Sequence, residues 1–470
     1  MLAGAVCVSV LAGCTTKNQY YEEISMSRKA AYQQWKARKH QQLESQPQVS
    51  GNLGITRCLE LTLKHNKMLQ RVLEEKGIAR GEKLKAISAY LPKVAVQADV
   101  KRYGLQDVEI PEIPGVDVNM PPRIGDVTNN ALEISVTQPI YAGGAIPATV
   151  NSAELTILLA DQAVRTAFLE IVYAARHSYY DVLLSQHLLE ISSDAVRSAQ
   201  AHLDSVKQKR QGGIASDFDV LRAEVELSNF QAQQLRNQNA IHISHAQLIR
   251  TMGVSQDSDF ILSDSLTYEV SSTTLDKAVQ MAFDHRPDLY QGEISVKLKQ
   301  QQVKMAKSHY LPRVQWSYGQ SLSSVDIQGL EDKGTGSNSL VWLSAQIPIF
   351  DGFARQGRVV QQRARLKQAQ IDLIDTEETV LFELTRAVLS IEDANEFVIS
   401  QKLNLTRAQE GLRLAEVGYQ QGVNTQVEMI DTQSALTTAR VNYYQAIYSH
   451  VIAKLNLQKA MGTLAPTPKG

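Results

Sequence analysis

Residues 213–221 read GIASDFDVL, and residues 422–430 read GVNTQVEMI. Each stretch begins with a glycine, the residue that most easily takes the left-handed conformation in which many helices end. Ser216 and Thr425 then stand at the position of an N-cap, and an acidic residue follows each of them three residues later. Both stretches therefore predict a tight turn that ends one helix and begins the next.

The two turns lie 209 residues apart, and other features of the chain repeat at the same offset. Met252-Gly253 corresponds to Met461-Gly462, and Pro139 corresponds to Pro348. Self-similarity over so long a period indicates the duplication of one large unit. We expect a signal peptide at residues 1–13, a lipid anchor and tether at 14–50, a first repeat at 51–255, a second repeat at 256–465 and a tail at 466–470.

Long helices are predicted where proline is absent, between Pro147 and Pro287 and between Pro348 and Pro466. Apolar residues recur in these spans at steps of four and three, which is typical of helices packed side by side. At ~1.5 Å per residue, each long helix would extend about 100 Å. The predicted long helices are residues 146–211 and 354–421, and the shorter helices that return after each turn are 217–252 and 426–461.

Two strands are predicted in each repeat, because apolar and polar residues alternate there. Each pair follows an amphipathic helix, at residues 55–91 or 275–311, that ends in Tyr-Leu-Pro. Strands of about 10 residues have the length that crosses an outer membrane in a tilted β-barrel, and a soluble hairpin over a core is the alternative. Segments 103–130 and 319–339, which are rich in turn-forming residues, are predicted as exposed loops. The predicted strands centre on residues 94–100, 132–140, 314–318 and 341–347.

Four membrane strands cannot close a barrel, because the smallest bacterial barrels have about 8. An open sheet edge in lipid would leave backbone groups without partners. The strands must therefore be shared between subunits, and three copies would give 12 strands, although two or four copies also satisfy the arithmetic. We expect an α+β membrane protein that forms a homotrimeric 12-stranded β-barrel, with four strands per subunit, continued by a long α-helical barrel.

The N-terminal segment contains the run Leu11-Ala12-Gly13-Cys14 after an apolar stretch that starts at Leu2. This run resembles the lipobox of bacterial lipoproteins, so we expect Cys14 to be lipidated and to become the first mature residue. An ordinary secretory signal is the alternative, and the basic start of a signal peptide is missing. The other cysteines, Cys7 and Cys58, complete no disulfide framework, and Cys58 is expected to be a small core residue.

Composition and motifs exclude several classes of function. The formal net charge is −1, which gives no electrostatic reason to bind nucleic acid. The sequence has no Walker A, HExxH, GxSxG or GxGxxG pattern, so we expect neither an enzyme nor a cofactor. His242 and His245 lie three residues apart on a predicted helix, where a metal site and a solvated face are the two interpretations.

Several motifs together resemble the TolC family of outer-membrane efflux channels, in its lipoprotein form. They include Tyr-Leu-Pro before the first strand of each repeat and the run His285-Arg286-Pro287-Asp288-Leu289. Residues 138–144 match 347–352, and Tyr419–Asp431 is the most specific stretch. The resemblance covers nearly all of residues 51–465.

This resemblance implies a homotrimer in outer-membrane lipid with a periplasmic helical tunnel and no catalytic site. It implies two protein partners, a periplasmic adaptor protein and an inner-membrane pump. The implied function is to carry substrates out of the cell as the channel of a tripartite efflux pump. A channel for type I protein secretion is an alternative. A lipid-anchored periplasmic coiled-coil scaffold is another, but it would not need strands of membrane length.

The resemblance also implies two sites near the turns. Tyr419 and Asp219 occupy the positions of a contact that holds the tunnel closed, although Asp219 also fits plain N-capping by Ser216. Glu428 and Asp431 occupy positions at the pore constriction, where three subunits would form an acidic ring. Glu428 equally fits a capping box with Thr425, and a solvated helix face is the alternative for Asp431. The family often has an arginine at the position of Asn424, so a second, charged closing contact is in doubt.

Overall fold

The computed structural model describes residues 17–45, 48–104, 106–107, 123–124, 127–327 and 334–464. The predicted signal peptide, Cys14 and the predicted tail at 466–470 lie outside the described residues. The chain divides into two compact units, and each takes segments from both halves of the sequence. Unit 1 comprises residues 1–67, 168–274 and 387–459, and unit 2 comprises residues 68–167, 275–386 and 460–470.

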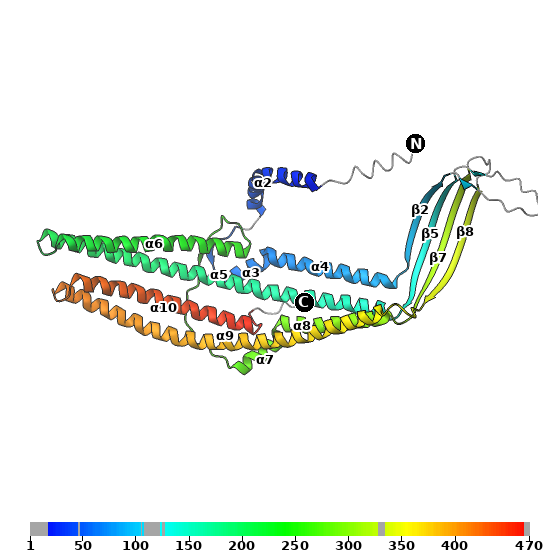
Figure 1. Ribbon diagram of the computed structural model, residues 1–470. Helices are drawn as coiled ribbons and strands as arrows, with labels where there is room; N and C mark the ends of the chain where they lie inside the picture. Colours follow the sequence, from blue (N-terminus) through cyan, green and yellow to red (C-terminus); the bar gives the residue numbers. More distant parts are fainter. Residues whose placement is uncertain are drawn as a thin grey trace, which may run out of the picture. The chain divides into compact units, whose positions relative to one another are not determined.

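The same order of elements occurs twice along the chain: two helices, two strands, a long helix and a return helix (Figure 1). The first set is α3 (Ile55–His65), α4 (Lys67–Ile87), β2 (Lys93–Tyr103), β5 (Val127–Ala142), α5 (Ala145–Gln211) and α6 (Asp217–Met252). The second set is α7 (Leu275–His285), α8 (Pro287–Ser308), β7 (Arg313–Ile327), β8 (Gly334–Gln346), α9 (Ala354–Gln420) and α10 (Gln426–Ala460). The remaining elements are α2 (Lys17–Ser45), β1 (Ser50–Leu53), the 3₁₀ turn η1 (Ser88–Tyr90), β3 (Gln106–Asp107), β4 (Arg123–Ile124) and β6 (Asp259–Leu262).

Backbone geometry repeats at the offset seen in the sequence. Three pairs of glycines 209 residues apart have left-handed φ values that agree within one degree. These pairs are Gly143 (63°) and Gly352 (64°), Gly213 (76°) and Gly422 (75°), and Gly253 (73°) and Gly462 (72°). Strands β1 and β6 pair in parallel at the same offset, with Ser50 opposite Asp259 and Leu53 opposite Leu262.

The long and return helices have the predicted bounds to within one residue. In unit 1, α6 packs on α5 through small and apolar side chains, while Lys207 pairs with Glu224 at 3.0 Å. In unit 2, α4 lies along α5, where Lys76 pairs with Asp161 at 2.6 Å. Across the described ranges, no helix combines the length and apolar character needed to cross a membrane. The α5–α6 core contains Ala195, Ala199, Leu203, Val206, Val220, Ala223, Leu227 and Phe230.

The predicted single helices at 55–91 and 275–311 are wrong, because each divides into two. The first breaks at Asn66, whose ψ of 121° is extended rather than helical. The second breaks at Arg286, since Pro287 follows it and disfavours a helical conformation in the residue before it. The polar tether contains helix α2, which its sequence without a clear period did not predict.

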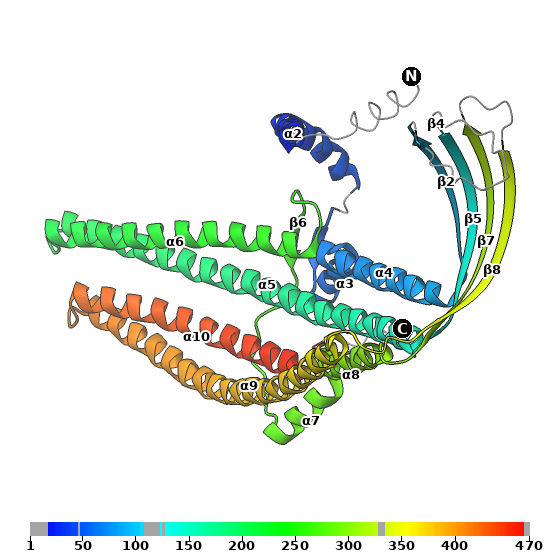
Figure 2. The same ribbon diagram turned by 45° about the vertical axis from the view of Figure 1, so that its right-hand side comes forward.

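Four strands form an antiparallel sheet in the order β2-β5-β7-β8 (Figure 2). The predicted loop at 319–339 is too long, because β7 continues to Ile327 and β8 begins at Gly334. Serine and glycine are common in this part of the two strands, so the alternation of apolar residues fades there, but the pairing with β5 continues up to Val127 opposite Ile327. Within the other predicted loop, β3 and β4 form a short two-stranded sheet.

Candidate functional site

The turns that end the two helical hairpins are built alike. At the first turn, Gly213 takes φ 76°, and the N–H of Ile214 donates to the carbonyl of Lys209 at 2.8 Å. Ser216 then caps α6: its Oγ accepts from the N–H of Asp219 at 3.2 Å. The Asp219 carboxylate in return accepts from the N–H and the hydroxyl of Ser216, at 2.9 and 2.7 Å. These hydrogen bonds to the ionised form lower the pKa of Asp219.

The second turn has the same capping box at the start of α10. The Glu428 carboxylate accepts from the N–H of Thr425 at 2.8 Å, and the N–H of Glu428 donates to the Thr425 hydroxyl at 3.3 Å. Asn424 packs against Gly418, where a β-carbon would lie 2.7 Å from the Asn424 amide. Asp431 lies one turn further along α10, on the exposed surface of the single chain.

A hydrogen bond joins the two hairpins. The buried side chain of Gln426 donates from Nε2 to the backbone carbonyl of Asp219 at 2.9 Å. The first residue of α10 is thus attached to the first turn of α6. Because the contact uses the backbone carbonyl of Asp219, the Asp219 carboxylate keeps its hydrogen bonds with Ser216.

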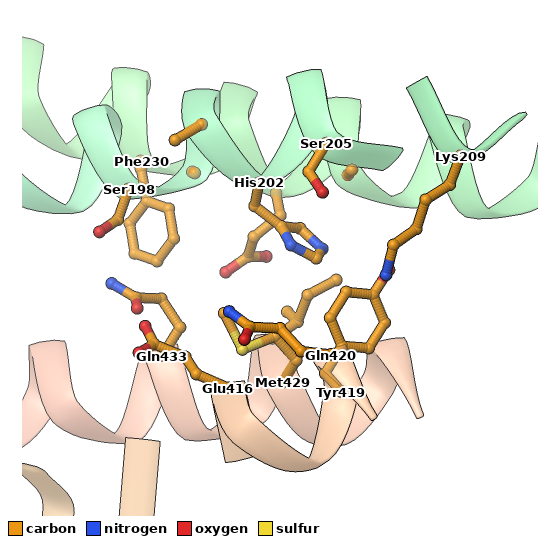
Figure 3. Close-up of a pocket in the computed structure, with 15 residues that line it drawn as sticks. Ser198, His202, Ser205, Lys209, Phe230, Glu416, Tyr419, Gln420, Met429 and Gln433 are labelled. Atoms are coloured by element: carbon orange, nitrogen blue, oxygen red, sulfur yellow. The ribbon is translucent and has the colours of Figure 1, made fainter. Parts of the chain in front are cut away.

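Tyr419 lies beside two side chains from the other hairpin (Figure 3). The ammonium of Lys209 is 3.7 Å from the centre of the Tyr419 ring, which is a cation–π contact. The ring of His202 is centred 5.6 Å from that of Tyr419 and inclined to it by 55°. All three border a cavity of about 400 Å³ between α5, α6, α9 and α10.

His202 is the unusual polar group in this cavity. Its Nε2 is buried and finds no hydrogen-bond partner among the residues that the structure describes. Burial lowers the pKa of His202, and the nearby charge of Lys209 lowers it further. An imidazole in this setting is therefore neutral at pH 7.

The structure thus brings together Asp219 with Ser216, and Glu428 with Thr425, which are the capping interactions considered from the sequence. It places the ring of Tyr419 against Lys209 and His202, two residues that the sequence did not single out. Lys209 and His202 are seven residues apart on α5 and so share a helix face, but only the fold brings them to Tyr419.

The other candidate positions have structural roles. His245 stacks on Phe260 at 5.2 Å, and its half-buried setting lowers its pKa. Among the described residues, no three His, Cys, Asp or Glu side chains gather into a group that could hold a metal ion. Cys58 is buried in the core of unit 1, and this burial raises the pKa of its thiol to about 12.

Comparisons with known proteins agree on one family. The family model described as "Outer membrane efflux protein" matches residues 60–254 and 278–463. Outer membrane protein TolC of Escherichia coli is 22% identical over 297 residues, which are 61% of this chain and 60% of TolC. Outer membrane protein OprJ of Pseudomonas aeruginosa is 22% identical over 327 residues, 68% of this chain and 67% of OprJ.

The fold agrees as well. The crystal structure of the Campylobacter jejuni CmeC outer membrane channel matches with a TM-score of 0.74 at 14% identity, over 88% of this chain and 87% of CmeC. The aligned part of TolC is less than two thirds of its length, whereas the family model covers both halves of this chain and most of its residues. The chain therefore belongs to the outer membrane efflux protein family.

Proposed function

We propose that this chain is the outer-membrane channel of a tripartite efflux pump, which carries substrates from the periplasm or from an inner-membrane pump to the outside. Family membership supports a role in efflux, and the names of the relatives support a place in the outer membrane. The observation that carries it is a four-stranded sheet with one apolar face, one polar face and two unpaired edges.

The two faces follow from the register of the strands. Residues directly opposite one another on paired strands lie on the same face. One such row is Val94, Val136, Tyr318 and Val341, which is apolar across all four strands. A row of opposite parity is Gln97, Glu133, Ser321 and Asn338, which is polar. An apolar face toward lipid and a polar face toward a lumen is the pattern of an outer-membrane barrel wall.

The two edges argue for a shared barrel. Strands β2 and β8 each have one neighbour within the described sheet. In lipid, an unpaired edge costs several kcal/mol for each unsatisfied backbone group, so β8 of one subunit would pair with β2 of the next. Three subunits then give a closed barrel of 12 strands, and the helical hairpins of the trimer form a tunnel in the periplasm.

The partners follow from this assignment. A periplasmic adaptor protein joins the tunnel to an inner-membrane pump, and outer-membrane lipid surrounds the barrel. The signal peptide at 1–13 is removed, and acyl chains on Cys14 add a second attachment to the barrel's own insertion. The two repeats, 51–255 and 256–465, each supply two strands and one helical hairpin.

Two substitutions test the barrel directly. Val96 is 66% exposed in the single chain and belongs to the apolar face, and Gln97 is its neighbour on the polar face. Val96→Arg should cost about 2–4 kcal/mol in lipid, so the amount of trimer in the outer-membrane fraction should fall. Gln97→Arg is the matched control, and it should assemble normally.

The readouts are native mass spectrometry of the detergent-solubilised protein and conductance in planar bilayers. We expect a mass of three chains and a steady conductance. A coiled-coil scaffold would give no conductance and would tolerate both substitutions equally, and that result would refute the proposal.

A further inference from the structure

We propose that Lys209 and His202 position Tyr419 in the closed state of this channel, and that protonation of His202 releases Tyr419 and opens the tip. The tip is the narrow end of the tunnel, where the turns 212–216 and 421–425 lie. The inference rests on the proposed channel function, since it assigns positioning residues to the narrow end of the tunnel. Tyr419 is the group that acts, and Lys209 and His202 act through it.

The contact between Lys209 and Tyr419 joins the α5–α6 hairpin to the α9–α10 hairpin. Lys209 lies in the last turn of α5, and Tyr419 is the last residue but one of α9. The ammonium lies over the face of the ring at 3.7 Å, where the negative face of the π-system attracts a cation. Together with the bond from Gln426 to the carbonyl of Asp219, this contact holds the two turns side by side.

Lys209 also supplies a positive charge near the second turn. Asn424 in that turn is uncharged and packs against Gly418. The positive charge that contacts α9 near this turn is therefore that of Lys209, from the opposite hairpin. The Lys209 ammonium contacts the ring of Tyr419, not its hydroxyl.

His202 lies where an added charge would disturb this contact. It is two helical turns before Lys209 on α5, and its ring adjoins that of Tyr419. The charged groups that line the same cavity are Lys209 from α5, Glu226 from α6 and Glu416 from α9. Helix α10 contributes Met429, Ile430 and Gln433, which are uncharged.

Protonation would place a second cation beside Lys209, and it would place a charged N–H at a buried position where the described part of the chain offers no acceptor. Separation of the hairpins would hydrate this charge and end its repulsion of Lys209. The packing seen in the structure lowers the pKa of His202, whereas an open, hydrated tip would restore an ordinary pKa. The closed state is therefore favoured above that ordinary pKa and loses stability as the pH falls below it.

The test is conductance of the full-length protein in planar bilayers at pH 7.5 and pH 5 (the range in which an ordinary histidine titrates). Wild type should open severalfold on acidification. His202→Gln should remove this response. Lys209→Met should conduct more than wild type already at pH 7.5, and Lys209→Arg should restore the wild-type level because it keeps the cation. His245→Gln is the matched control, a half-buried histidine outside the cavity that should keep the wild-type pH profile.

Substitutions of Tyr419 distinguish a closing contact made by its ring from one made by its hydroxyl. Tyr419→Phe keeps the ring and should stay closed at pH 7.5, whereas Tyr419→Leu should open. If Tyr419→Phe opens fully instead, the hydroxyl fastens the tip and the ring contact does not.

Other outcomes would also overturn the inference. An acid response that persists in His202→Gln would do so, as would closure on acidification. A wild-type protein without conductance at either pH would refute the channel function together with this inference. A conducting protein with unchanged variants would refute this inference alone. Circular dichroism of each variant checks that it has folded.

Discussion

The backbone carbonyl of His65 lies against Gly253, so close that a β-carbon on that glycine would stand 2.5 Å from the oxygen. Gly253 also takes φ 73°, where other residues are strained. The second repeat has the same arrangement, with Gly462 against His285. In each repeat the end of the return helix therefore packs against the break between the first two helices.

The first prediction is that Gly253→Ala destabilises the protein more than Gly213→Ala. Gly213 has a similar left-handed φ, but no atom of the described residues lies within 4 Å of the position of its β-carbon. Gly213→Ala should therefore lower the free energy of unfolding by about 1–2 kcal/mol, through backbone strain alone. Gly253→Ala adds a clash with backbone atoms, which cannot move away as a flexible side chain can. We therefore expect it to lower the free energy of unfolding by about 3 kcal/mol or more. Thermal unfolding followed by circular dichroism measures both, and equal midpoints would contradict the role of the His65 contact.

The second prediction concerns Arg286, which joins the second break to the end of α10. Its guanidinium lies 2.7 Å from the Glu383 carboxylate, 2.6 Å from Asp288 and 3.1 Å from the carbonyl of Ala460. The side chain is only 12% exposed, so Arg286→Leu should leave two carboxylates without their partner and cost about 3 kcal/mol.

Arg413 provides the matched control for Arg286. It pairs with Glu410 at 2.7 Å, but both side chains are well exposed. Arg413→Leu should therefore leave the free energy of unfolding nearly unchanged, because solvent screens this ion pair. If denaturant unfolding shows the same loss for both variants, the Arg286 network does not stabilise this junction.

Sequence was a good guide where the cause of a structure is local. The ends of α6 and α10 depend on a glycine, a capping hydroxyl and an acid within a few residues, and all of these can be read from neighbouring positions. The strand pattern predicted a strand within each of β2, β5, β7 and β8 for the same reason, but its span 314–318 covers only the first part of β7. Both helical hairpins therefore have their predicted bounds to within one residue.

Sequence was a poor guide where distant contacts decide the structure. The break at Asn66 is stabilised by its side chain, which donates to the carbonyl of Thr251, 185 residues away. Residues 319–327 of β7 are strand because β5 supplies their hydrogen-bond partners, although their own side chains are mostly small or polar. The contact of Lys209 with Tyr419 likewise depends on how two hairpins pack, and no motif marks it.

The third prediction is that Phe353→Gly relieves backbone strain in the turn before α9. Phe353 has φ 68°, the one left-handed φ found at a non-glycine position in the described residues. Gly144 has φ 81° at the corresponding place in the first repeat. Removing the strain should raise the free energy of unfolding by about 1 kcal/mol. Loss of the ring contact with Phe350, whose ring centre lies 5.6 Å away, opposes this gain.

Phe350→Gly is the control for Phe353→Gly, because it loses the same ring contact without relieving strain. The midpoint of thermal unfolding should be higher for Phe353→Gly than for Phe350→Gly. The reverse order would mean that glycine relieves no strain at position 353.

The fourth prediction concerns the proposed acidic constriction. Glu428 and Asp431 lie three residues apart, so they share one face of α10 near its start. The Glu428 carboxylate accepts from the N–H of Thr425, so Glu428→Ala should cost about 1 kcal/mol of stability through this lost hydrogen bond. Asp431 is beyond the cap and exposed in the single chain, so its substitution should leave stability unchanged.

In a trimer, three Asp431 carboxylates around one axis would favour cations and bind multivalent cations. Asp431→Asn should therefore lower the preference for potassium over chloride and weaken block by divalent or trivalent cations from the periplasmic side. Asp204→Asn is the matched control, because Asp204 is an exposed acid on α5 that bonds to Gln200. Planar-bilayer recordings give both selectivity and block. Unchanged block in Asp431→Asn together with loss of block in Glu428→Ala would move the ring by one turn, whereas unchanged block in both variants would remove it.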